Sequence, residues 1–156
     1  MVGAPLAPPT ATRRYWLAGM LCAVLPDIDA VGRPFGWGDL AFLGGHRALT
    51  HSITFALLLG LTVAAVAFRE ARWQERRPRI AAYLILATAS HGLLDAFAGY
   101  GEGVEFLSPF SAARYTAPWR PLLGLNEIAW IWLPALLIIV IAWRLRRPDG
   151  SDSAAP

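Results

Sequence analysis

Long apolar runs separated by short polar clusters dominate this chain. The run at residues 53–68 contains no charged residue, and the run at 80–100 carries His91 and Asp95 inside an otherwise mostly apolar stretch. About 20 residues cross the hydrocarbon of a bilayer, at a helical rise of about 1.5 Å per residue. Both runs, the first counted from about residue 49, are therefore predicted to be transmembrane helices.

Two further runs are shorter but fit the same pattern. Residues 15–25 end in a Pro-Asp-Ile-Asp sequence, and residues 128–143 contain Pro134, which predicts a kink. Flanking Trp and Tyr side chains are typical anchors at membrane interfaces. With these runs included, the sequence predicts an all-α, multi-pass membrane helical bundle with about four transmembrane helices.

The composition agrees with this class. The chain is 56% hydrophobic and 16% charged, with a mean hydropathy of +0.43, whereas about a quarter of the residues of a soluble domain are charged. We expect a tail at residues 1–14, a membrane-embedded domain at 15–147 and a disordered tail at 148–156. The net charge of +3 does not require nucleic acid as a partner, and none is expected.

The arginines predict an orientation. All 14 basic residues are arginine, and with four spans ten of them fall in the N-terminal tail, the second loop and the C-terminal tail. Positive charge marks the cytoplasmic side of a membrane protein. Both termini are therefore expected in the cytoplasm, and the first and third loops outside.

Polar clusters gather on the predicted outer face. They comprise Asp27 and Asp29 after the first run, His46 to Ser52 before the second, His91 and Asp95 in the outer half of the third, and Glu127 before the fourth. Ionisable residues within a membrane are costly and usually functional. The convergence predicts a polar site at this face.

Histidine and aspartate are the side chains that borderline metal ions prefer. Residues four apart stack on one helix face, so His91 and Asp95 can chelate one cation; the alternative is a buried hydrogen-bonded pair. The predicted metal ligands are Asp29, His51, His91 and Asp95, with zinc favoured and manganese or magnesium as alternatives. Such ions activate a bound water near neutral pH.

Other residues receive catalytic or binding roles. His46, Arg47 and Asp27 are predicted to be catalytic, with Arg47 suited to a phosphate through its planar fork. Ser111, Arg114 and Arg120 lie in an aromatic, proline-rich loop and join Arg47 as predicted substrate-binding residues. Simple interfacial anchoring is the alternative for this loop and for its arginines.

Four ordered motifs carry a resemblance. Pro26 to Asp29, Gly45 to Ser52, His91 to Asp95 and Ser108 to Ser111 are similar to the membrane-bound metal-dependent hydrolases known as YdjM-like inner-membrane proteins. The resemblance implies a multi-pass protein of the bacterial inner membrane, remotely similar to the zinc-dependent phospholipase C and P1 nuclease group. Residues 12–16 lack the histidine that members often carry there, so one or two metal ions are expected.

These observations predict a metal-dependent hydrolase that cleaves a phosphoester, of a lipid or an envelope precursor, with a metal-activated water. Membrane lipids are the expected surroundings, and the oligomeric state stays open. One alternative is a small transport or proton-relay protein that uses its intramembrane Asp and His. Another is a structural membrane module whose buried polar pairs hold helices together.

Overall fold

The computed structural model describes residues 13–123, 126, 128–134, 136–137 and 141. Within these residues all regular elements are helical and there is no strand, which confirms the all-α prediction. Two isolated bridges, Ala98 with Leu122 and Val104 with Tyr115, join the segments of one loop.

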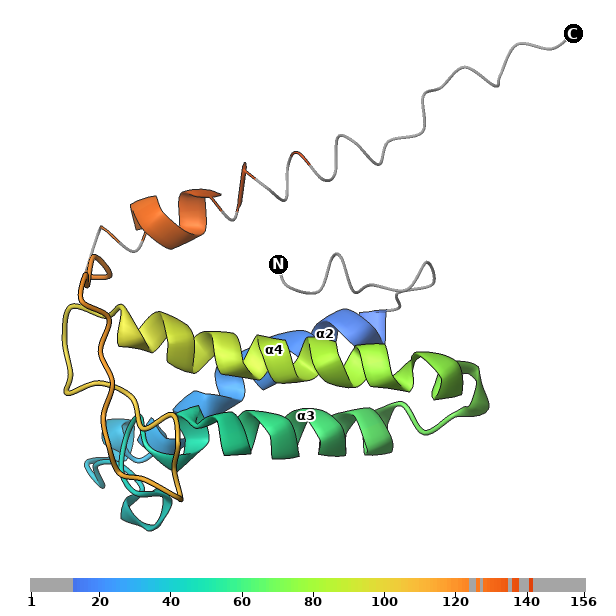
Figure 1. Cartoon of the computed structure of the whole chain (residues 1–156), viewed down its shortest axis with the longest axis horizontal. Coiled ribbons are helices and arrows are strands. Elements are labelled where there is room, and N and C mark those ends of the chain that lie inside the picture. Colours follow the sequence, from blue (N-terminus) through green and yellow to red (C-terminus); the bar gives the residue numbers. More distant parts are fainter. Residues whose placement is uncertain (1–12, 124–125, 127, 135, 138–140, 142–156) are drawn as a thin grey trace, which may run out of the picture.

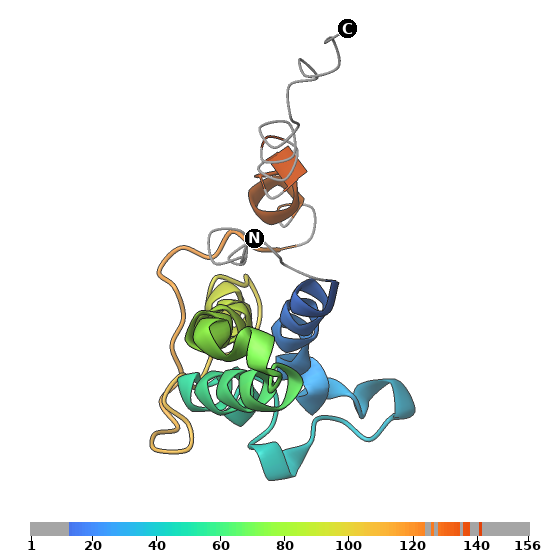
Figure 2. The same ribbon diagram turned by 90° about the vertical axis from the view of Figure 1, so that its right-hand side faces the viewer.

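Three α-helices form the body of the protein. They are α2 (Arg13–Val24), α3 (Ile53–Ala67) and α4 (Arg77–Ala96). α3 and α4 run side by side, and α2 also packs mainly against α4, so α4 is the shared partner of both helices (Figure 1, Figure 2). Arg13 and Arg14, which were predicted to end the tail, belong to α2.

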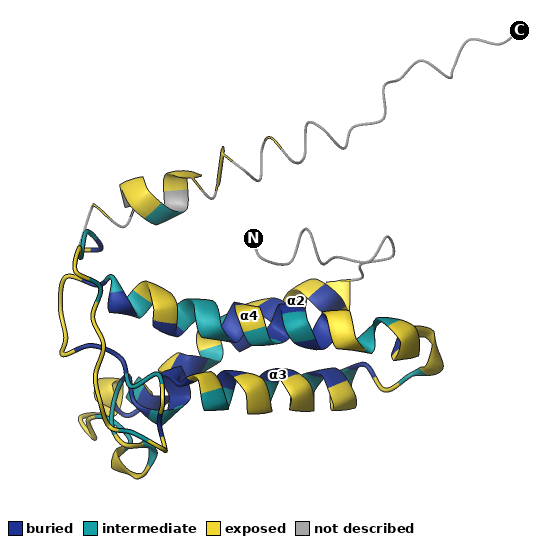
Figure 3. Cartoon of the chain, in the orientation of Figure 1, coloured by how far each residue is buried: buried dark blue, intermediate teal, exposed yellow. Residues whose placement is uncertain are grey.

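The core contains aromatic rings and close helix contacts. The rings of Tyr15 and Tyr83 stack with centroids 4.3 Å apart, joining α2 to α4. Gly60 brings α3 against α4, because a Cβ at this position would lie 2.7 Å from the backbone nitrogen of Ile85. The face of α3 turned away from α4 is exposed, as Figure 3 shows in yellow, and most of the exposed residues on α3 are apolar, including Leu57, Leu58 and Leu61. Such a surface is typical of contact with lipid.

Short 3₁₀ segments shape the two ends of the bundle. η1 (Leu25–Ala30), η2 (Arg33–Phe35), η3 (Ala41–Leu43) and η4 (Leu49–His51) lie in the chain between α2 and α3, and η5 (Ala71–Arg76) lies between α3 and α4. A π-helical turn, η6 (Ile128–Trp132), lies apart from the three helices in both views (Figure 1, Figure 2).

The helix boundaries differ from those expected by a few residues. The second apolar run was expected to become helical at about Leu49, but α3 begins only at Ile53, because the Ser52 side chain accepts a hydrogen bond from the backbone N–H of Phe55 and caps the helix there. The third helix was expected over residues 80–100, but α4 spans Arg77–Ala96. It begins at Arg77 because Pro78 fits the first turn of a helix.

Among the described residues, one stretch is long and apolar enough to cross a membrane. The stretch Arg13–Phe35, which comprises α2, η1, a two-residue turn and η2, is 23 residues long and apolar enough to span a bilayer, and Ile53–Ala67 is a shorter apolar helix. Of the predicted fourth span, residues 128–143, the structure describes 128–134, 136–137 and 141. The count of four spans therefore stays a prediction.

Two arginine-rich segments of the described chain meet at one end of the bundle. The start of α2 and the connection between α3 and α4 meet there, and Arg14 forms an ion pair with Glu70 of that connection (Figure 1). Hydrogen bonds from Arg14 and charge from Arg72 hold the pKa of Glu70 below its ordinary value. The histidines and aspartates lie at the opposite end.

Candidate metal centre

The turn after α2 supplies two aspartates. Pro26 stands in the first turn of η1, where the chain tightens from an α-helix to a 3₁₀ helix. The side chain of Asp29 becomes fully buried as a result, while half of the Asp27 side chain stays exposed. One aspartate thus faces the interior and the other faces the mouth of the site.

The buried carboxylate of Asp29 organises the segment before α3. His46 Nδ1 lies 2.8 Å from its Oδ1, and the Thr50 hydroxyl donates to its Oδ2 at 2.6 Å. The backbone N–H of Arg47 also donates to Oδ2, at 3.3 Å. A buried carboxylate needs such donors, because an unpaired one would be costly. Thr50 therefore serves as a supporting hydrogen-bond donor to Asp29.

His51 lies at the centre of the cluster. Its side chain is fully buried, and its Nδ1 lies 3.1 Å from the Thr50 hydroxyl and 3.3 Å from Asp29 Oδ2. Because the Thr50 hydroxyl donates to Asp29, Nδ1 is best satisfied as the protonated nitrogen. That tautomer leaves a lone pair on Nε2.

Helix α4 brings the third histidine to the same place. Nδ1 of His91 lies 2.8 Å from the backbone carbonyl oxygen of Ala23 on α2, which turns its Nε2 toward Asp27 Oδ1 at 3.3 Å. Gly92 lets α4 approach, because a Cβ there would lie 2.6 Å from the carbonyl oxygen of His51. One turn further along, Asp95 Oδ2 lies 3.2 Å from His51 Nε2.

Arg47 is built into the wall of the site. It has a φ of +64°, and its side chain is 4% exposed. Its Nε lies 3.0 Å from Asp95 Oδ2, and its Nη1 donates to the carbonyl oxygen of Tyr100 at 2.8 Å. The guanidinium also lies over the ring of Tyr100, 4.9 Å from the centroid. Through these contacts Arg47 positions Asp95, a role for Arg47 that the sequence did not predict.

Two groups of side chains offer ligand atoms close enough for one ion each. Asp27, His51 and His91 form the first group, and Asp29, His46 and His51 form the second; in each group the ligand atoms lie within 4.8 Å of one another. In the first, Asp27 Oδ1 lies 3.7 Å from His51 Nε2 and 3.3 Å from His91 Nε2. Ligand atoms of a tetrahedral zinc site, each about 2.0–2.1 Å from the ion, lie about 3.3 Å apart.

The residues of the first group fit a divalent cation. His51 Nε2 is buried and has no hydrogen-bond partner among the described residues. It nevertheless faces two carboxylates, those of Asp27 and Asp95. A lone pair and two negative oxygens repel one another unless a cation or a proton lies between them. Hydrogen bonds from the other ring nitrogen, as His51 and His91 make, are typical of metal-ligating histidines.

The residues predicted to bind substrate make other contacts. Arg114 forms an ion pair with Glu105, and the Ser111 hydroxyl accepts from the backbone N–H of Ala113. Arg120 donates to the carbonyl oxygens of Ala98, Tyr100 and Gly101. All these partners lie within the loop at residues 97–123. Their predicted role in substrate binding stays a prediction, and Glu127 lies outside the described residues.

Comparison with known proteins agrees with the motifs. The family model described as "YdjM inner membrane protein" matches residues 1–149. The chain belongs to the YdjM inner membrane protein family. Inner membrane protein YbcI of Escherichia coli (strain K12) is 31% identical over 166 aligned positions, which cover 94% of this chain and 90% of that protein. This YdjM-family chain is therefore a bacterial inner membrane protein.

No solved structure matches this YdjM-family chain. The remote similarity to the phospholipase C and P1 nuclease group finds no support in the comparisons. The family names describe a location, and they assign no activity. The predicted hydrolase activity must therefore be argued from the His and Asp geometry.

Proposed function

We propose that this YdjM-family protein is a metal-dependent hydrolase of phosphoesters. The observation that carries the proposal is the buried Nε2 of His51, which faces two carboxylates without a hydrogen-bond partner among the described residues. Asp27, His51 and His91 would hold the ion, with Asp95 as a fourth ligand. A divalent cation bound there supplies Lewis-acid activation of water and neutralises a phosphoester's negative charge.

The proposal gives the two aspartates different roles from those expected from the sequence. Asp29 was expected to bind metal and Asp27 to be catalytic. Both oxygens of Asp29 already accept hydrogen bonds from His46, Thr50 and the backbone of Arg47. Asp29 therefore orients His51, while the half-exposed Asp27 is free to bind an ion.

His51 also limits the number of ions. Its Nε2 serves the first group and its Nδ1 faces Asp29 in the second. A neutral imidazole has one lone pair on nitrogen, so it cannot serve both groups unless the ring loses its proton. We therefore favour one ion, in the first group.

His46 is the residue best placed to move a proton. It is hydrogen-bonded to Asp29, is partly exposed, and its ring meets His51 edge-on with centroids 5.2 Å apart. Arg47, tied to Asp95 and Tyr100, holds a ligand in place instead of reaching for the substrate. This assignment makes Arg47 a positioning residue.

Metal analysis of the detergent-purified protein tests the proposal. We expect about one zinc or manganese per chain in the wild type, and loss of the metal and of phosphodiesterase activity in His91→Ala and Asp27→Asn. Asp39→Asn is the matched control, because this aspartate pairs with Arg33 in the loop before η3. Metal-free wild type, or full activity in His91→Ala, would refute the proposal.

The orientation is part of the same proposal. We place the His and Asp end on the outer side and the arginine-rich end in the cytoplasm, because positive charge is retained inside. A Cys22→Ser background allows single cysteines at Asp39 and Arg72 to report the two ends. An impermeant maleimide should label position 39 in intact spheroplasts and position 72 only after lysis. The reverse pattern would overturn the orientation.

The transport or proton-relay alternative has less support. It needs ionisable groups distributed through the depth of the membrane. Between the cluster and the arginine-rich end, the described core contains Tyr15, Tyr83, Leu84 and Phe68. The three imidazoles lie with the carboxylates of Asp27, Asp29 and Asp95 at one end, as expected for a site that acts on a molecule at the membrane surface.

A further inference from the structure

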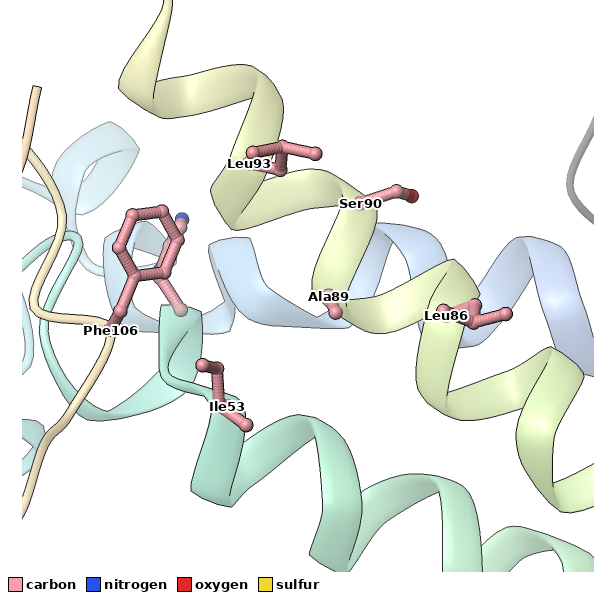
Figure 4. Close-up of a pocket in the computed structure, with 7 residues that line it drawn as sticks. Ile53, Leu86, Ala89, Ser90, Leu93 and Phe106 are labelled. Atoms are coloured by element: carbon pink, nitrogen blue, oxygen red, sulfur yellow. The ribbon is translucent and has the colours of Figure 1, made fainter. Parts of the chain in front are cut away.

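A cavity of about 470 Å³ lies beside the metal centre. It is bounded by the start of α3, one face of α4 and the loop that follows α4 (Figure 4). Its lining residues are Ile53, Leu86, Ala89, Ser90, Leu93 and Phe106, together with His51. His51 thus belongs both to this cavity and to the cation-binding group.

The wall that α4 contributes is apolar. Leu86, Ala89, Ser90 and Leu93 recur at the spacing of one helix face. Ser90 does not interrupt it, because its hydroxyl donates to the carbonyl oxygen of Ala87 on its own helix, at 2.8 Å. A ligand in the cavity would therefore meet hydrocarbon along α4 and an imidazole at one position only.

The cavity opens on a surface suited to lipid. The side chains of Ile53, Leu86 and Leu93 on its rim are about half exposed. In an inner membrane protein, exposed leucines and isoleucines on the helices of the bundle face the acyl chains of the bilayer. The volume lies within the range of about 300–1,000 Å³ common for small-ligand pockets.

We propose that the cavity holds a hydrocarbon chain of the substrate, which makes the substrate an amphiphilic lipid with a phosphoester headgroup. With the chain between α3 and α4, the headgroup would lie at His51, next to Asp27 and Asp95. The headgroup chemistry rests on the proposed hydrolase function, whereas binding of the chain does not. A glycerophospholipid and an isoprenoid phosphate share this chemistry, and the experiment distinguishes them.

A second apolar groove provides an internal comparison. It measures about 620 Å³, lies between α2 and α3, and is lined by Leu17, Leu21, Leu59 and Val63, with Arg13 and Arg14 at one end. Its lining includes none of the clustered histidines and aspartates. Lipid that merely solvates the helices would occupy both grooves alike.

Photolabelling of the full-length protein in detergent–lipid micelles tests the proposal without metal or turnover. Two probes are used in parallel, a phosphatidic acid with a diazirine in its acyl chain and an isoprenoid phosphate with a diazirine near its terminus. Labelled residues are located by tandem mass spectrometry in the tryptic peptides 48–69 and 80–114. Ala89→Phe fills the cavity, and Ala65→Phe, at an exposed position on α3, is the matched control.

We expect one probe to label the residues of the cavity and to identify the lipid class. Labelling should fall at least fivefold in Ala89→Phe and stay within twofold of wild type in Ala65→Phe. Leu93→Trp, at an exposed position on the rim, should give the same loss and replaces Ala89→Phe if that variant does not fold. Equal labelling in wild type and in both cavity variants, or equal labelling of the α2–α3 groove and the cavity, would overturn the proposal.

An activity measurement separates this proposal from the hydrolase function. Ala89→Phe should keep its metal content and its turnover of a small water-soluble phosphodiester, but lose at least tenfold in turnover of the long-chain lipid. If the wild type holds no metal and the cavity is still labelled, the chain site stands and the hydrolase function fails. If hydrolysis occurs and Ala89→Phe affects both substrates equally, the chain site fails.

Discussion

Gly92 is the position at which one added methyl group would act directly on the candidate metal centre. It stands on α4 between His91 and Asp95, against the backbone of His51. A Cβ there would lie 2.6 Å from the carbonyl oxygen of His51, whereas an ordinary contact starts at 3.4 Å. Gly92→Ala must therefore move α4 and the chain before α3 apart by about 0.8 Å, the difference between these two distances.

A shift of this size should strongly weaken metal binding and only slightly lower the free energy of unfolding. Metal–ligand distances tolerate about 0.2 Å, and changes that disturb the support of metal ligands typically cost about 10–100-fold in affinity. Overpacking costs about 1–3 kcal/mol, while alanine gains about 1 kcal/mol over glycine in a helix. We expect zinc affinity to fall at least about tenfold, with a net loss of about 0–2 kcal/mol in stability.

Zinc competition against a chromophoric chelator, with thermal unfolding of the same samples, measures both quantities. Gly60→Ala is the matched control, since its Cβ would lie 2.7 Å from the backbone nitrogen of Ile85 in the same helix pair, away from the ligands. It should lower stability comparably and reduce zinc affinity less. Wild-type zinc affinity in folded Gly92→Ala would refute the argument that this contact sets the spacing of the ligands.

Three further changes separate the roles of neighbouring charges. Asp29→Asn should keep the protein folded but lower zinc affinity about 10–100-fold, because it weakens the support of a ligating histidine; isothermal titration measures this, and unchanged affinity would exclude the orienting role. Arg47→Ala should cost about 3 kcal/mol in unfolding free energy, since it removes a buried guanidinium from its pair with Asp95, whose side chain is only 20% exposed. Chemical denaturation measures the loss, and an unchanged midpoint would contradict it. The ionised carboxylate of Glu70 stabilises the fold fully at pH values above the ordinary pKa of glutamate. This stabilisation is lost as the pH falls through the lowered pKa of Glu70 in the folded protein. The difference between thermal midpoints at about pH 7 and about pH 3 should therefore be smaller in Glu70→Gln than in wild type, and an equal difference would contradict the ion pairs with Arg14 and Arg72.

Much of the site followed from the spacing of polar residues along the chain. Asp29, His51, His91 and Asp95 were expected to meet at one end of a helical bundle, and the structure brings them together. The prediction worked because an ionisable group next to an apolar run must find partners, and each cluster stood at the same end of its run. The bounds of the apolar runs located the three helices to within a few residues.

The division of labour inside the cluster did not follow from spacing. On a continuous helix, His46 would share a face with Thr50, and Arg47 would share one with His51. Arg47 instead adopts a left-handed conformation that breaks the helix before η4. The partners of His91 and Arg47 include the carbonyl oxygens of Ala23 and Tyr100. Backbone carbonyls leave no signature in a sequence, so only three-dimensional packing reveals them.

The proposed ligands come from η1, η4 and α4, and this distribution orders the events of biogenesis. A newly made chain cannot hold the ion until α4 has entered the membrane and packed against its two neighbours. Before that step Asp27 lacks His91, and the His51 imidazole lacks Asp95. Binding of the proposed ion would thus be a late step of maturation, and cells starved of the metal should contain chains that are inserted in the membrane but lack the ion.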